Sequence, residues 1–118
     1  MNDYASGSLI AQVRPGDTNN ATAITATVRL EIGRIIIANT SSGAATFRLF
    51  HDVGGTTYDE ANALAWDVSI AVGAINDALQ SFNTGNGITL MPTDSLGVRV
   101  STGNALTFNI YGVLADAR

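Results

Sequence analysis

The sequence contains no cysteine and no lysine, and each absence excludes a class of protein. Without cysteine there is neither a disulfide framework nor a thiolate metal site. Without lysine, all six basic residues are arginines, which suit paired or interfacial positions better than a fully solvated surface. The arginines are scattered singly in a chain of net charge -4, so no basic stripe can neutralise nucleic-acid phosphates.

Charged residues are also scarce. They make up 14% of the 118 residues, against about 25% in typical soluble domains. A short chain with so little charge is expected to cover part of its surface with another protein. Its apolar runs are too short to span a bilayer, and its first residues lack the basic and apolar regions of a signal peptide. We therefore expect one domain with a single core and no membrane partner.

The main positive signal is alternation of apolar and polar residues with period two, which is typical of half-buried β-strands. It predicts strands at residues 24–32, 45–49, 64–72, 96–100 and 106–110. Trp66 alternates in phase with Leu64 and Val68, so its side chain is expected in the core rather than at a sugar-binding surface.

Two further segments predict strands for other reasons. Three consecutive isoleucines within residues 34–39 favour a strand that is covered on both faces. Residues 8–14 form a weaker pattern and predict an edge strand that ends at Pro15-Gly16. Residues 75–82 have helical spacing of apolar side chains, which predicts a short helix or an irregular crossing between sheets.

The segments between the strands are rich in glycine, asparagine, aspartate and serine, as turns are. Thr102-Gly103 separates two alternating runs and predicts a tight hairpin, in which residues 96–101 and 104–113 are antiparallel neighbours. The sequence thus predicts an all-β fold, a single-domain antiparallel β-sandwich over residues 8–118, with jelly-roll connections as one arrangement. Residues 1–7 are expected to form a flexible N-terminal arm.

Few residues suggest chemistry. His51 is the single histidine, and a metal site needs three or four ligands, so it is expected to end a strand and hydrogen-bond locally. Asp52, Asp59 and Glu60 surround the Gly54-Gly55 turn, but their spacing is not that of a calcium loop, which favours turn solvation. We expect no catalytic residue, no cofactor and no metal. An enzyme built around His51 and a carboxylate is the weakest alternative.

Three longer stretches resemble a family of known proteins. They read RIIIANTSSGAATFRLFHD at residues 34–52, GGTTYDEANALAWDVSI at 54–70 and DSLGVRVSTGNALTFNIYGV at 94–113. Together they resemble a diffuse group of short proteins encoded among the structural genes of tailed bacteriophages. The resemblance implies a virion component that folds as a small β-sandwich and oligomerises, often with three-fold symmetry, and it implies no catalytic residues.

The function expected from these observations is that of a capsid decoration or cement protein, which stabilises a shell through symmetric subunit contacts. The expected location is the virion, assembled in the host cytoplasm. The expected partners are further copies, as a homotrimer, and other virion proteins such as the major capsid protein. The candidate interface residues are Tyr4, Arg29, Arg48, Tyr58, Arg99 and Tyr111.

Two alternatives stay open at the level of sequence. A tail, neck or fibre-attachment module would need the same symmetric interfaces. A carbohydrate-binding module would stack sugars on Tyr58, Trp66 or Tyr111, which requires these aromatic side chains to be exposed on one face.

Overall fold

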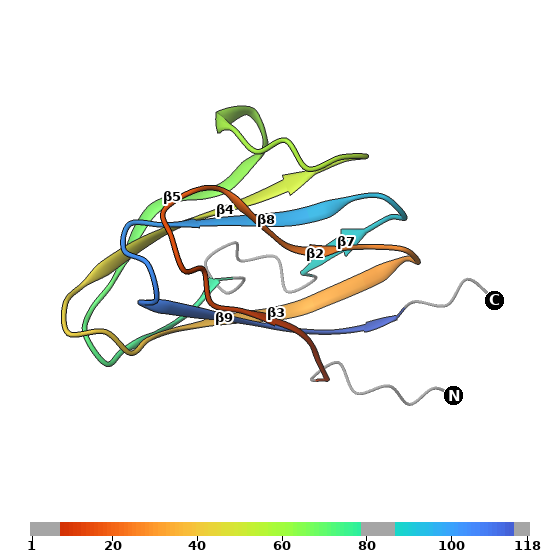
Figure 1. Ribbon diagram of the computed structural model, residues 1–118. Coiled ribbons are helices and arrows are strands. Elements are labelled where there is room, and N and C mark those ends of the chain that lie inside the picture. The colour runs from red at the N-terminus through yellow and green to blue at the C-terminus, as the bar shows by residue number, and fades with distance from the viewer. Residues whose placement is uncertain (1–7, 79–86, 115–118) are drawn as a thin grey trace.

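The computed structural model describes residues 8–78 and 87–114, which form two antiparallel sheets packed face to face (Figure 1). The five-stranded sheet contains β1 (Leu9–Val13), β9 (Leu106–Leu114), β3 (Leu30–Asn39), β6 (Ile75–Asp77) and β7 (Ile88–Leu90). The four-stranded sheet contains β2 (Ala21–Thr25), β8 (Ser95–Val100), β4 (Ala45–Asp52) and β5 (Ala63–Ile70). A 3-10 helix, η1 (Glu60–Asn62), lies between β4 and β5. No helix in these ranges is long and apolar enough to cross a membrane.

The strand order is that of a jelly roll. The strands pair from the outside of the sequence inwards: β1 with β9, β2 with β8, β3 with β6 and β7, and β4 with β5. Successive pairs alternate between the two sheets. This is the arrangement of one long antiparallel ribbon wound around a sandwich. The predicted β-sandwich is confirmed, and its connections are of the jelly-roll kind.

Alternating side chains from both sheets fill the space between them. The largest fully buried side chains of this core include Phe47, Leu49, Leu96, Val98, Ile35, Ile37, Leu106, Phe108 and Ile110. Phe47 of β4 and Phe108 of β9 meet edge to face with ring centroids 5.9 Å apart, which joins the two sheets at the centre. Fully burying one such side chain contributes about 1.5–3 kcal/mol, so this layer is the main source of stability.

The predicted hairpin at Thr102-Gly103 is wrong. β8 and β9 lie in different sheets, and the residues between them form an arch from one sheet to the other (Figure 1). Both strands bury one apolar face, and these faces meet across the core instead of lying side by side. The arch is held by contacts distant in sequence, because the Asn104 amide donates to the Pro15 carbonyl at 2.8 Å and the Arg14 guanidinium donates to the Asn104 carbonyl at 2.6 Å.

The single strand predicted at residues 24–32 is also wrong, since the chain changes sheet within it. β2 ends at Thr25 and β3 begins at Leu30 in the other sheet. β3 then continues through the isoleucine run, with a register shift between Ile32 and Arg34 that moves the buried positions to Ile35 and Ile37. The bulge explains why the alternation of the two segments is out of phase although they form one strand.

The helix or crossing predicted at residues 75–82 is contradicted at its beginning. Residues 75–77 form β6, which pairs with Ile36–Ala38 of β3. The crossing between sheets occurs earlier, between the end of β5 and the start of β6. A strand is favoured here because residues 75–77 can form backbone hydrogen bonds with the edge of β3, whereas an isolated helix of two turns is barely stable. Residues 79–82 of this prediction lie outside the described residues, as does the predicted arm at 1–7. The edge strand predicted at 8–14 is present as β1, which pairs with β9 alone.

Candidate interaction surface

The outer face of the four-stranded sheet carries the side chains that β4 and β8 direct away from the core. The two strands place residues directly opposite each other, in the pairs Arg48–Arg99, Phe50–Gly97 and Asp52–Ser95. These pairs divide the face in two. The covered half consists of Phe50, Asp52, Ser95 and Gly97 beneath Tyr58. The open half consists of Arg48, Arg99, Thr46, Ser101 and, from β5, Trp66 and Asp67.

The covered half is closed by Tyr58, from the loop that joins β4 to η1. Its ring stacks on Phe50 with centroids 5.6 Å apart, and it lies so close to Gly97 that a Cβ there would meet the ring at 2.5 Å. The Tyr58 hydroxyl shares hydrogen bonds of 2.8 Å with Ser95 Oγ and with Thr22 Oγ1. Tyr58 is 9% exposed. The prediction that it is an exposed aromatic contact is therefore wrong, because a glycine on β8 leaves room for its ring.

Asp94 anchors the start of this loop. Its carboxylate accepts hydrogen bonds from the Gly54 amide at 3.2 Å and the Met91 amide at 3.1 Å, and it lies 3.4 Å from His51 Nε2. Burial acts to raise the pKa of Asp94. The hydrogen bonds from Met91, His51 and Gly54 outweigh it, so the pKa lies below its ordinary value.

Two other acidic side chains of this region stabilise the segment between β4 and β5. Asp52 accepts a hydrogen bond from the Thr57 amide at 2.8 Å, and Asp59 caps η1 by accepting one from the Ala61 amide at 2.9 Å. His51 is the penultimate residue of β4, close to the predicted position at the strand's end, but its contact is with Asp94, far away in sequence, and not local. Within residues 8–78 and 87–114, no three His, Asp or Glu side chains are grouped to hold a metal ion.

The open half is shaped by a β-bulge in β5. Phe47 faces Val68 and Leu49 faces Ala65, so Trp66 and Asp67 together oppose the single residue Arg48. Asp67 takes a left-handed conformation, with φ of 53°, as an aspartate can at a bulge. The bulge shifts the alternation and leaves Trp66 41% exposed. The prediction that Trp66 belongs to the core is therefore wrong, and the sequence pattern contains no sign of the inserted residue.

Arg48 connects the two residues of the bulge. Its guanidinium carbon lies 3.7 Å from the centroid of the Trp66 ring, in a cation–π contact. The same guanidinium binds Asp67 through two hydrogen bonds, Nε–Oδ1 of 2.7 Å and Nη2–Oδ2 of 3.2 Å. The hydrogen bond from Arg48 lowers the pKa of Asp67 against a smaller opposing effect of burial, and the positive charges of Arg48 and Arg99 lower it further. The Arg48 pKa is raised by the same bond.

Arg99 lies opposite Arg48 in the neighbouring strand, and both line a hollow of about 420 Å³. Thr18, Thr46 and Ser101 place hydroxyl groups around the hollow, and Asp67 and Val100 complete its wall. Among the described residues, no carboxylate lies within 4.0 Å of the Arg99 guanidinium. Two of the six predicted interface residues, Arg48 and Arg99, are thus brought together.

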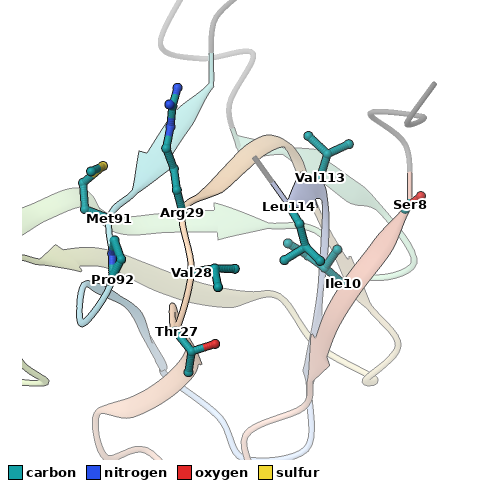
Figure 2. Close-up of a pocket in the computed structure, with 10 residues that line it drawn as sticks. Ser8, Ile10, Thr27, Val28, Arg29, Met91, Pro92, Val113 and Leu114 are labelled. Atoms are coloured by element: carbon teal, nitrogen blue, oxygen red, sulfur yellow. The ribbon is translucent and has the colours of Figure 1, made fainter. Parts of the chain in front are cut away.

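The other predicted interface residues lie elsewhere. Arg29 forms an ion pair of 2.7 Å with Glu31 and lines a groove at the end of the sandwich (Figure 2). Tyr111 is half-buried on β9, in the other sheet. Tyr4 lies outside the described residues. With Tyr58 buried, and with Trp66 and Tyr111 on different sheets, the aromatic side chains do not share one face, as a sugar-binding platform would require.

The groove at the end of the sandwich is apolar and has a volume of about 890 Å³. Figure 2 shows Val28, Met91 and Pro92 on one wall and Ile10 and Leu114 on the other. Val28, Met91 and Leu114 are 45%, 51% and 55% exposed. The groove is a second exposed surface, and Arg29 is the charged residue among those that line it (Figure 2).

No protein-family model matches the sequence, and no curated protein matches it. The chain is similar to one in the structure of infectious bursal disease virus, Gx strain, with 15% sequence identity and a TM-score of 0.48. The similarity covers 95% of this chain and 33% of the viral chain, so this chain spans about a third of the viral chain's length. A likeness at this level does not identify a function.

Proposed function

We propose that this protein is a structural component of the virion of a tailed bacteriophage, most simply a capsid decoration or cement protein. It binds to the assembled shell and stabilises it through symmetric contacts, as a homotrimer that also contacts the major capsid protein. Its activity is binding, with no reaction catalysed. Its location is the virion, which is assembled in the host cytoplasm.

The observation that carries this proposal is the open half of the four-stranded sheet. It presents an exposed tryptophan, Trp66, with Arg48 packed on its ring and Arg99 beside it. Tryptophan and arginine are enriched at the positions that contribute most to protein–protein binding. Arg48 covers one face of the Trp66 ring, so the two side chains are presented together at the surface.

The composition and the topology support the same function. A chain with 14% charged residues and no lysine has little purely solvated surface. A jelly roll is a rigid scaffold that viral capsid proteins use, as do lectins and cupins. Weak contacts repeated by symmetry can stabilise a shell, because each copy binds the assembled state and so shifts the equilibrium towards it.

The polar side chains of this region that could take part in a reaction are used in structural hydrogen bonds. Asp94, the partner of His51, accepts hydrogen bonds from two backbone amides, and these bonds hold the loop that carries Tyr58. This use of the single histidine supports a role without catalysis.

The test is to grow the phage that encodes this protein and to locate the protein in the purified particles. Particles are separated into heads and tails, and each fraction is probed with an antibody against the chain. We expect the protein in heads, at a fixed ratio to the major capsid protein. Its presence in tails would identify a tail, neck or fibre-attachment module. Its absence from all particles would contradict the proposed function.

Light scattering on the purified chain tests the symmetry of the assembly. A molar mass three times that of the 12.2 kDa chain, independent of concentration, is the expected result. A monomer at every concentration would contradict the homotrimer. The copies would then be arranged symmetrically only when they are bound to the shell.

A further inference from the structure

We propose that the hollow between Arg48 and Arg99 binds a carboxylate side chain from a neighbouring protein subunit. The proposal deepens the proposed function, on which it rests for the identity of that neighbour. It names a ligand class for the open half, and Arg99 as the residue that recognises it.

The charges around the hollow are not balanced. Arg48 and Arg99 face each other across two strands, a pairing of like charges that is unfavourable by itself. Asp67 compensates one of the two through its paired hydrogen bonds with Arg48. The three side chains keep one net positive charge in a chain whose total charge is -4. One carboxylate from outside would complete the set.

The hollow also offers hydrogen-bond donors to a ligand. A guanidinium offers donors in a planar fork that matches a carboxylate. Within the part of the chain that the structure describes, the Arg99 fork has no acidic partner. Ser101 Oγ accepts a hydrogen bond of 2.8 Å from the Thr46 amide, which leaves its own hydroxyl proton available to an acceptor in the hollow.

The charge of the wall favours a monoanionic ligand. The carboxylate of Asp67 forms part of the wall and repels a dianion such as phosphate more strongly than it repels a monoanion. A monoanion needs only the one unpaired guanidinium. The side chain of Val100, the residue between Arg99 and Ser101, is buried in the core, so the side chains that face the hollow are polar or charged. These features favour a single carboxylate.

The position of Asp67 indicates that the arrangement is specific. The bulge that carries Asp67 interrupts the ladder of backbone hydrogen bonds and places Asp67 in a left-handed conformation. It also brings the Asp67 carboxylate onto Arg48, whose guanidinium lies over Trp66. With Arg48 fixed in this way, Arg99 is the guanidinium that remains available on the open half.

Trp66 reports on this site directly, because it is the single tryptophan of the chain. The experiment follows its fluorescence while a blocked peptide that carries a single glutamate is added at constant ionic strength. We expect a saturable change with the wild-type protein. Arg99→Gln should weaken the binding about tenfold, because a charge-assisted pair is lost. Arg34→Gln is the matched control, since it removes an arginine of the other sheet that pairs with Asp77 at 3.3 Å, and it should bind as the wild type does.

Arg99→Lys provides a second variant in case the first one is poorly folded. It keeps the charge and loses the fork, so its affinity should fall between those of the wild type and Arg99→Gln. Inorganic phosphate, titrated in the same way, should bind more weakly than the peptide. A wild-type protein that shows no saturable change, an Arg99→Gln variant that binds unchanged, or a preference for phosphate would each overturn the proposal.

These outcomes are separate from the test of the proposed function. A protein that is found in particles but does not bind the peptide keeps its virion role and loses the carboxylate site. A protein that binds the peptide but is absent from particles keeps the site and loses the virion role.

Discussion

The two halves of one sheet face differ in what covers them. On the covered half, the chain's own loop brings Tyr58 down onto Phe50 and Gly97 and satisfies its hydroxyl. On the open half, Trp66 and Arg99 have no such cover from the described residues. Trp66 stands at the boundary, edge to face with Phe50 at 6.2 Å and beneath Arg48 at 3.7 Å.

The difference separates stability from recognition. Side chains of the covered half are packed against one another and joined by hydrogen bonds, so replacing them should alter the free energy of unfolding. Side chains of the open half lie at a surface, so changing them should alter binding with little effect on folding. The predictions below test that separation, from the largest expected effect to the smallest.

Tyr58→Ala should have the largest effect. It removes a buried ring and leaves Phe50 and Gly97 uncovered, which we expect to lower the free energy of unfolding by about 3 kcal/mol. Urea denaturation measures it. Tyr58→Phe keeps the ring and loses the bonds to Ser95 and Thr22, so it should cost about 1 kcal/mol. A loss below 1 kcal/mol for Tyr58→Ala would show that the loop does not cover this half in solution.

Gly97→Ala should have the next largest effect. The added methyl group would lie 2.5 Å from the Tyr58 ring, and the ring would have to move off Phe50. Overpacking of this kind should cost about 2 kcal/mol, measured as a shift of the urea midpoint at constant slope. Gly43→Ala is the control, because no atom lies within 4 Å of a Cβ there, and it should be neutral.

Asp94→Asn tests the anchor of the covering loop and its dependence on pH. An amide cannot accept as many hydrogen bonds, so we expect a loss of about 1–2 kcal/mol at pH 7. Because the folded-state pKa of Asp94 lies below its ordinary value of 3.8, its stabilisation is present above that value and is lost as the pH falls through the folded-state pKa.

The difference in unfolding free energy between wild type and Asp94→Asn should therefore shrink below about pH 4, as determined by urea denaturation across that range. Glu60→Gln is the control, because it also removes one carboxylate, from an exposed position of η1, and should change the free energy of unfolding at pH 7 by no more than about 0.5 kcal/mol. A difference that stays constant from pH 7 to pH 2.5 would contradict the role given to Asp94.

Arg99→Gln should have the smallest effect on folding. It removes a charge that faces Arg48, so the free energy of unfolding should change by no more than about 0.5 kcal/mol. Thermal and urea unfolding measure it. A large destabilisation would mean that Arg99 stabilises the fold, and it would contradict the proposed role of Arg99 in recognition.

Period-two alternation was sufficient to predict the sandwich, because one face of each strand must meet the core. It could not predict partners: residues 96–101 and 104–113 have the same pattern whether they form a hairpin or an arch. β8 pairs with β2 and β4, and β9 pairs with β3. These pairings join strands that are distant in sequence, so local alternation does not reveal them.

The candidate surface was predictable only in part. Arg48 and Arg99 were selected for their residue type, and strand pairing places them together. Trp66 was assigned to the wrong face because one inserted residue at Asp67 reverses the alternation. Tyr58 lies in a loop without periodicity, and its burial depends on Gly97, a glycine nearly forty positions away. Bulges and covering loops leave no periodic trace in a sequence.

The most direct test of the account is hydroxyl-radical footprinting of Trp66 in the free chain and in purified particles. The account predicts that the oxidation of Trp66 falls several-fold in the particles, because a neighbouring subunit covers the open half. Met91, which is 51% exposed in the end groove and not part of the open half, serves as the internal reference. If Trp66 is oxidised as fast in particles as in the free chain, the open half does not face a neighbour and the central claim is contradicted.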